Sequence, residues 1–142
     1  MTAKFAFLGL CGFFAAAPAL AEVTVAQRDT TLAVWQSAFD DWAPTLTCGA
    51  TMTASDEFVR KIWQDSKDEA LAAMQAAGWP EIDLADLRAK ADADALRLPP
   101  DTLFADVLSY CAAHPDWSKK ASQMRFLPLA TEVRKALSGA TP

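Results

Sequence analysis

Few side chains in this sequence could carry covalent chemistry. The 142 residues include three cysteines, Cys11, Cys48 and Cys111, and a single histidine, His114. Ser-His-Asp and Cys-His enzymes need a base, which is normally histidine, and a zinc site needs three or four closely spaced Cys, His or acidic ligands. His114 precedes Pro115, so an exposed residue at a helix end is the simpler interpretation. We therefore expect no enzymatic activity, no catalytic residues, no metal site and no cofactor.

Neighbouring acidic residues offer a second kind of chemistry, general acid–base catalysis. Such neighbours occur at Asp40-Asp41, at Asp68-Glu69 and at Asp92 to Asp94. Acidic residues on solvated helix faces explain them better than a catalytic pair does. The sequence also contains no C-x-x-C-H haem motif, no phosphate-binding glycine loop and no G-x-S-x-G turn.

The first 21 residues have the features of an export signal. Lys4 supplies a positive n-region, Phe5 to Ala17 form an apolar h-region of 13 residues, and Ala19-Leu20-Ala21 is a small-x-small cleavage site. The apolar run ends at Pro18, so it is too short for a membrane span, which needs about 20 residues. We therefore predict a signal peptide that is cleaved, and a location in the periplasm.

Cleavage leaves residues 22–142, which we expect to form one helical domain. The full sequence is 52% hydrophobic and 22% charged, a globular composition. Its formal charge is −5, and the loss of Lys4 makes it −6. Nucleic-acid-binding proteins need a basic face, so we expect no nucleic-acid partner. Because no later segment is long and apolar enough to span a bilayer, we also expect no stable membrane insertion after cleavage.

Two cysteines remain after cleavage, Cys48 and Cys111, 63 positions apart. In an oxidising compartment two cysteines most simply form one disulfide. Closing a loop of this size would stabilise the fold by roughly 4 kcal/mol on the chain-entropy relation, out of about 5–15 kcal/mol for a small domain. The functional alternative is a redox or nucleophilic thiol, but the sequence has no C-x-x-C motif.

Helices must position these residues, because apolar residues recur with helical spacing and no stretch alternates for long enough to form a strand. A first helix is predicted over Arg28–Trp42, since Pro44 should end it. Cys48 then falls in a connection, Ala43–Thr53.

Three further helices are predicted before residue 115. Their expected limits are Ala54 to Gly78 with Thr53 as N-cap, Leu84 to Leu96 with Asp83 as N-cap, and a helix capped by Asp101 or Thr102 that ends at His114-Pro115. The last stretch, Asp116–Ser138, should be kinked or broken at Pro128 and closed by Gly139. The fold class is all-α: an irregular bundle of five or six short helices with one disulfide, after the N-terminal signal peptide.

Apolar side chains three or four residues apart mark one face of the helix that follows Pro99-Pro100. They are Leu103, Phe104, Val107, Leu108 and Cys111, and we expect this face to point into the core. Most of the five tryptophans also have core spacing. Trp79 differs, because it lies in the turn between Gly78 and Pro80, where an exposed indole could contact a ligand or a partner.

Acid reverses the charge of the mature chain. At neutral pH it carries 12 basic and 18 acidic side chains once Lys4 is removed. Near pH 2 the acids are protonated and the charge becomes about +13 with His114. Repulsion then opposes the compact state, and native ion pairs are lost. A helical chain tethered by a disulfide could loosen under these conditions and expose its Trp, Phe and Leu faces.

A set of motifs surrounds the two mature cysteines between Ala43 and Lys120. It comprises Leu46-Thr47-Cys48, Trp63, Pro99-Pro100, Val107-Leu108-Ser109-Tyr110-Cys111, Pro115 and Trp117. This set resembles the HdeA/HdeB family of periplasmic acid-stress chaperones, whose members are small, exported and all-helical, with one disulfide joining two helical regions. The resemblance implies an ATP-independent holdase that loosens at low pH, dissociates and covers unfolded proteins with apolar surface, without metal or nucleotide.

The resemblance also implies roles for particular residues. Cys48 and Cys111 would be structural, the partners would be unfolded periplasmic proteins, and a homodimer is possible. Residues that would contact a client are Phe58, Ile62, Trp63, Leu103, Phe104, Val107 and Leu108, each of which has ordinary core packing as its alternative role.

A second hypothesis is a non-enzymatic periplasmic binding or interaction module, or an inhibitor of an envelope or secreted protein. Its exposed contact would lie around Trp79. Loss of apolar shielding in acid would favour the chaperone, whereas a stoichiometric complex with an envelope protein at neutral pH would favour the module.

Overall fold

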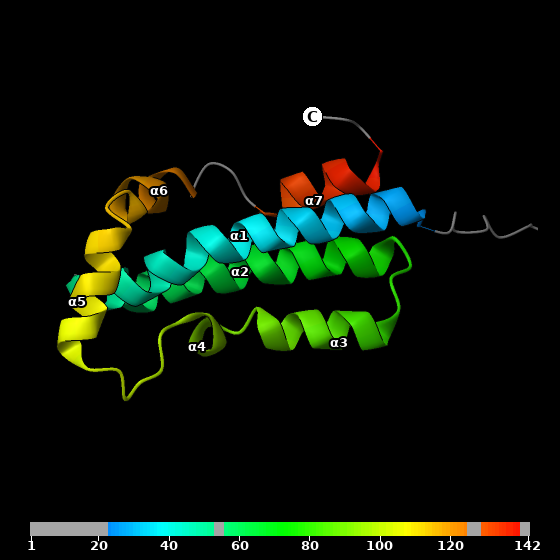
Figure 1. Ribbon diagram of the computed structural model, residues 1–142. Helices are drawn as coiled ribbons and strands as arrows, with labels where there is room; N and C mark the ends of the chain where they lie inside the picture. Colours follow the sequence, from blue (N-terminus) through cyan, green and yellow to red (C-terminus); the bar gives the residue numbers. More distant parts are fainter. Residues whose placement is uncertain (1–22, 53–55, 125–128, 140–142) are drawn as a thin grey trace, which may run out of the picture.

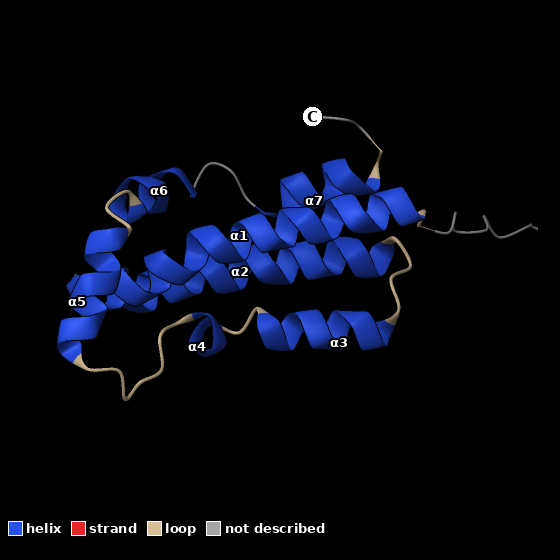
Figure 2. Cartoon of the chain, in the orientation of Figure 1, coloured by secondary structure: helices blue, strands red, loops and turns tan. Residues whose placement is uncertain are grey.

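Seven helices account for the regular structure of residues 23–52, 56–124 and 129–139, the part of the chain that the computed structural model describes (Figure 2). They are α1 (Val25–Met52), α2 (Asp56–Ala76), α3 (Glu81–Lys90), α4 (Ala93–Leu96), α5 (Phe104–Ala113), α6 (Trp117–Met124) and α7 (Leu129–Leu137). The described residues confirm the all-α class with one disulfide, with seven helices where the sequence predicts five or six. The predicted signal peptide, Thr53 and Pro128 lie outside the described residues.

The long helices α1 and α2 form an antiparallel hairpin around which the others are arranged (Figure 1). α7 lies against both, beside the N-terminal half of α1, and α3 runs along α2 on the other side. α5 and α6 lie at the opposite end, where α1 ends and α2 begins. Among the described helices, none has the length and apolar character needed to cross a membrane.

Helix α1 continues through Pro44 and Gly49. The prediction that Pro44 ends the first helix is therefore wrong, and Cys48 lies inside α1 instead of in a connection. Positions 44–49 are all buried, because α2, α4, α5 and α6 surround this half of α1. A proline inside a helix costs roughly 3 kcal/mol or more, and burial on every side outweighs that cost here.

Three tryptophans of the hairpin form the centre of the core, as their spacing predicts. The ring centroids of Trp35 and Trp42 lie 6.4 and 5.1 Å from that of Trp63. Trp63 is fully buried, and its Nε1 donates a hydrogen bond of 2.8 Å to the carbonyl oxygen of Ala91. This bond fixes the end of α3 against the hairpin.

The helix predicted over Leu84–Leu96 is two helices, α3 and α4. α3 begins at Glu81, so Asp83 lies inside its first turn and is not its N-cap. The break comes at Asp92, whose side chain accepts hydrogen bonds from the backbone N–H groups two and three residues ahead. Such local side-chain bonds compete with helix continuation, even in an Ala-rich run.

Two glycines end helices as the sequence predicts. Gly78, after α2, has φ +85°, and Gly139, after α7, has φ +70°, a conformation that favours glycine. The predicted cap of α5 is wrong, since Leu103 and not Asp101 or Thr102 occupies the N-cap position, without a side-chain hydrogen bond.

Candidate interaction surface

A disulfide joins the last turns of α1 to α5. The Cα atoms of Cys48 and Cys111 are 5.7 Å apart and their Sγ atoms are bonded, so the predicted pairing is confirmed. Both residues are buried, with exposed fractions of 0% and 4%. Burial shields the bond from soluble thiols, which fits a structural role better than a redox-active one.

The outward side of α5 carries an apolar ridge formed by Leu103, Phe104 and Leu108. Their exposed fractions are 71%, 64% and 38%. The expectation that this face points into the core is wrong for all three, while Val107 is half-buried and Cys111 is buried. α1 is the main packing partner of α5, so one side of this short helix is covered and the rest faces solvent.

The segment that leads into α5, Arg97–Thr102, is anchored to α1, and we call it the strap. Arg97 Nε donates a hydrogen bond of 3.0 Å to the carbonyl oxygen of Leu46, and the N–H of Leu98 donates one of 3.3 Å to Thr47 Oγ1. The strap fixes the start of α5 and the disulfide fixes its second half. The strap and the disulfide therefore hold α5 at this end of the bundle, and the ridge side chains themselves take no part in the attachment.

The other predicted client contacts lie in different environments. Phe58 is 52% exposed in the first turn of α2, at the end of the bundle where α5 lies (Figure 1). Ile62 is half-buried against the core, and Trp63 is fully buried at its centre. The folded chain therefore brings Phe58 to the same end as the ridge, whereas Trp63 is buried in the core and cannot contact a client in the folded state.

Trp79 is also buried, so the prediction of an exposed indole in this turn is wrong. Its exposed fraction is 7%, and the guanidinium carbon of Arg28 lies 5.0 Å from the centroid of its ring. The indole Nε1 is buried without a hydrogen-bond partner. The turn that suggested exposure folds Trp79 back onto the hairpin core, to which it belongs.

Ion pairs connect the outer helices to the hairpin. Arg28 of α1 pairs with Asp83 of α3 at 2.7 Å, and Lys120 of α6 pairs with Asp41 of α1 at 2.5 Å. The remaining connections are Arg134 of α7 with Glu69 of α2, Arg60 of α2 with Asp94 of α4, and Arg97 of the strap with Asp56 of α2. Each connection needs an ionised carboxylate, so acid weakens all of them.

These contacts shift the pKa values of Asp94 and Lys120, which lie on opposite sides of the neutral range. The hydrogen bond from Arg60 lowers the pKa of Asp94 below its ordinary value of 3.8. The hydrogen bond to Asp41 raises the pKa of Lys120 above 10.5. Both groups are therefore ionised at neutral pH and support the attachment of α4 and α6.

Sequence reasoning missed Arg97 and Asp56 as residues that position the candidate surface. Their ion pair spans 41 residues, and the bond from Arg97 to Leu46 spans 51. No local pattern identifies such partners. The nearest signal is the Pro99-Pro100 pair, which marks a connection that cannot hold itself by helical hydrogen bonds.

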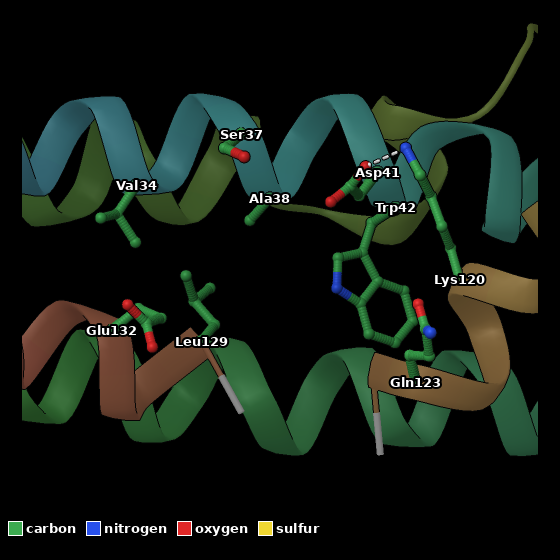
Figure 3. A pocket seen from close by; sticks show the side chains of 9 residues that line it. All are labelled: Val34, Ser37, Ala38, Asp41, Trp42, Lys120, Gln123, Leu129 and Glu132. Carbon is green, nitrogen blue, oxygen red and sulfur yellow. Dashed lines mark hydrogen bonds and ion pairs between the residues drawn. The ribbon is translucent and has the colours of Figure 1, made fainter. Parts of the chain in front are cut away.

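Apart from the ridge, the structure has a cavity of about 300 Å³ between α1, α6 and α7 (Figure 3). The side chains of Trp42 and Leu129 point into it, and the Asp41–Lys120 ion pair stands at one side. The described lining includes neither histidine nor cysteine. Within residues 23–52, 56–124 and 129–139 no group of three His, Cys, Asp or Glu side chains is arranged for a metal ion.

Comparisons of the chain with protein-family models, with curated proteins and with solved structures find no match.

Proposed function

We propose that this protein is an exported, ATP-independent holdase that binds unfolded periplasmic proteins in acid, in the manner of the HdeA/HdeB family. The observation that carries the proposal is the apolar ridge of α5, which faces solvent while a disulfide and the strap hold its helix. Leu103 and Phe104 are adjacent and each is more than 60% exposed, and contiguous exposed apolar surface marks interaction sites.

An apolar ridge suits an unfolded client because hydrophobic contact is non-directional. Unfolded proteins share exposed apolar side chains and no common shape, so a binding surface for them needs area more than specific hydrogen bonds. Leu103, Phe104 and Leu108 provide such area, and Phe58 lies at the same end of the bundle.

Acid would enlarge this surface. The connections from the hairpin to α3, α4, the strap, α6 and α7 each include one carboxylate. A single exposed pair contributes only about 0–1 kcal/mol, but acid removes all of them while the net charge becomes strongly positive. The disulfide does not titrate, so α5 stays attached to α1 while the other contacts weaken.

The test is suppression of aggregation of an acid-unfolded client by ridge variants. Phe104→Ser with Leu108→Ser removes most of the ridge without touching the disulfide. The matched control is Ile82→Ser on α3, because Ile82 is 77% exposed and lies away from α5. We expect the double variant to bind clients about tenfold more weakly and the control to act as the wild type. Equal protection by all three proteins would contradict the proposal.

One observation favours the second candidate, a module that binds one envelope protein. The ridge is exposed in the folded chain itself, so it could engage a folded partner without acid. A stoichiometric complex formed at neutral pH and lost in the Phe104→Ser and Leu108→Ser double variant would support the module. Client protection that appears only in acid would support the holdase.

A further inference from the structure

The cavity between α1, α6 and α7 has the size of a site for a small molecule. Its volume of about 300 Å³ lies at the lower end of the range that such sites cover. Because a water molecule takes up about 30 Å³ of liquid, this space corresponds to roughly ten non-hydrogen atoms. The described lining includes no residue of α5, so this cavity is separate from the ridge.

The walls of the cavity are largely apolar, and its inner end is formed by the core. Trp42 and Leu129 are only 5% and 6% exposed, and both side chains point into the cavity (Figure 3). Val34 and Ala38 lie two turns and one turn before Trp42 on α1 and extend the same wall. An apolar or aromatic group placed against these side chains would be removed from water, which favours its binding.

The indole of Trp42 adds a hydrogen-bond donor inside the cavity. Its Nε1 points into the open space (Figure 3), and none of the described residues accepts a hydrogen bond from it. Two other buried indoles of the core differ in this respect. Trp63 donates to the carbonyl oxygen of Ala91. Trp35 donates to Sδ of Met74 at 3.1 Å. Buried donors are nearly always paired, so Nε1 of Trp42 is available to an oxygen acceptor that enters the cavity.

The charged side chains around the cavity leave one carboxylate without a counter-ion. Lys120 pairs with Asp41 at 2.5 Å and with Asp116 at 3.4 Å, so two anions already share its charge. Glu132 stands on the opposite side of the cavity (Figure 3), and among the described residues no cation pairs with it. A protonated amine would supply the missing positive charge, whereas an anion would be repelled by the excess of carboxylates.

We propose that this cavity binds a small organic amine with an apolar or aromatic body, an oxygen that accepts from Trp42 Nε1, and an ammonium group near Glu132. Each of these three features matches one part of the lining: the walls, the buried donor and the unpaired carboxylate. The body supplies most of the affinity, because the carboxylate of Glu132 is exposed and water screens its charge. This site requires no client and goes beyond the proposed holdase function.

Titration with matched ligands, followed by NMR of the oxidised protein at pH 7, tests the site. The probe is tyramine, an aromatic amine with a hydroxyl oxygen at its other end. Phenethylamine lacks the oxygen, and 3-(4-hydroxyphenyl)propionate carries a carboxylate in place of the ammonium group. The indole signal of Trp42 is assigned by its loss in Trp42→Phe, and the backbone amide signals of the lining give the affinity of every variant.

Tyramine should shift the indole signal of Trp42 and bind with a dissociation constant on the order of 0.1–1 mM, as expected for a ligand of about ten atoms. Trp42→Phe keeps an apolar ring and removes the donor, so it should weaken tyramine about fivefold and leave phenethylamine unchanged. Glu132→Gln should weaken both amines about threefold. The propionate should bind more weakly than tyramine, because its charge has the wrong sign.

The matched control is Glu57→Gln, which removes an exposed carboxylate from α2, outside the described lining, and should bind tyramine as the wild type does. Equal binding of tyramine and the propionate would overturn the proposal, as would equal losses in Glu57→Gln and Glu132→Gln. A Trp42 indole signal that stays in place at about 10 mM tyramine would overturn it as well. Because Glu132 is exposed, Glu132→Gln keeps the test decisive if Trp42→Phe fails to fold.

Discussion

Replacing both cysteines, Cys48→Ala with Cys111→Ala, should lower the free energy of unfolding by about 4 kcal/mol. The disulfide joins residues 63 positions apart. A loop of that length removes about 14 cal/mol/K of entropy from the unfolded chain, which is roughly 4.3 kcal/mol at 25 °C. Alanine introduces no buried polar group at either position, so the tether is the main thing lost.

The loss should also be uneven across the molecule. Leu103 and Phe104 are exposed and α5 packs mainly on α1 alone, so without the tether α5 should detach before the hairpin that holds Trp63 unfolds. Guanidinium denaturation followed by tryptophan emission gives the global loss, and hydrogen exchange gives the loss of protection in α5. A global loss below about 1 kcal/mol, with α5 still protected, would refute the reasoning, because packing and not the disulfide would then hold α5.

Three further predictions concern the core and the pH dependence. Trp63→Phe should destabilise by about 1–3 kcal/mol more than Trp79→Phe, since the first leaves a buried carbonyl unpaired and the second removes a buried N–H that has no partner; equal urea midpoints would contradict this. Leu84→Ala should cost about 2–5 kcal/mol, because Leu84 is 1% exposed, and thermal unfolding measures it. Arg60 lowers the pKa of Asp94, so ionised Asp94 stabilises the fold above pH 3.8 and the contribution fades as the pH falls through its folded-state pKa. Asp94→Asn should therefore destabilise more at pH 7 than near pH 2, as urea denaturation at both pH values would show.

Helical periodicity predicts the fold class because each apolar stripe must be buried against another helix. The residues at which helices begin and end are harder to predict, since they depend on what surrounds each segment. Pro44 and Gly49 signal a break in any isolated sequence, but four other helices enclose that half of α1. Asp92 shows the opposite case, where a single local hydrogen-bonding side chain ends a helix that composition would continue.

The candidate surface could be predicted in part. Cysteine counting gives the Cys48–Cys111 pair, and spacing identifies Leu103, Phe104 and Leu108 as one face. Periodicity defines a face but cannot tell what covers it, so the sequence places this face in the core, whereas the structure exposes it. Arg97 has no local signal at all, because its role depends on partners 41 and 51 residues away.

The most direct measurement is photo-crosslinking from the ridge to a client. A photoreactive residue at Ala105, exposed on α5, is compared with one at Ala72, exposed on α2, in the oxidised protein mixed with an acid-unfolded client near pH 3. We expect crosslinks to the client from position 105 and few from position 72. Equal crosslinking from both positions, or none from 105, would contradict the assignment of α5 as the client-binding surface.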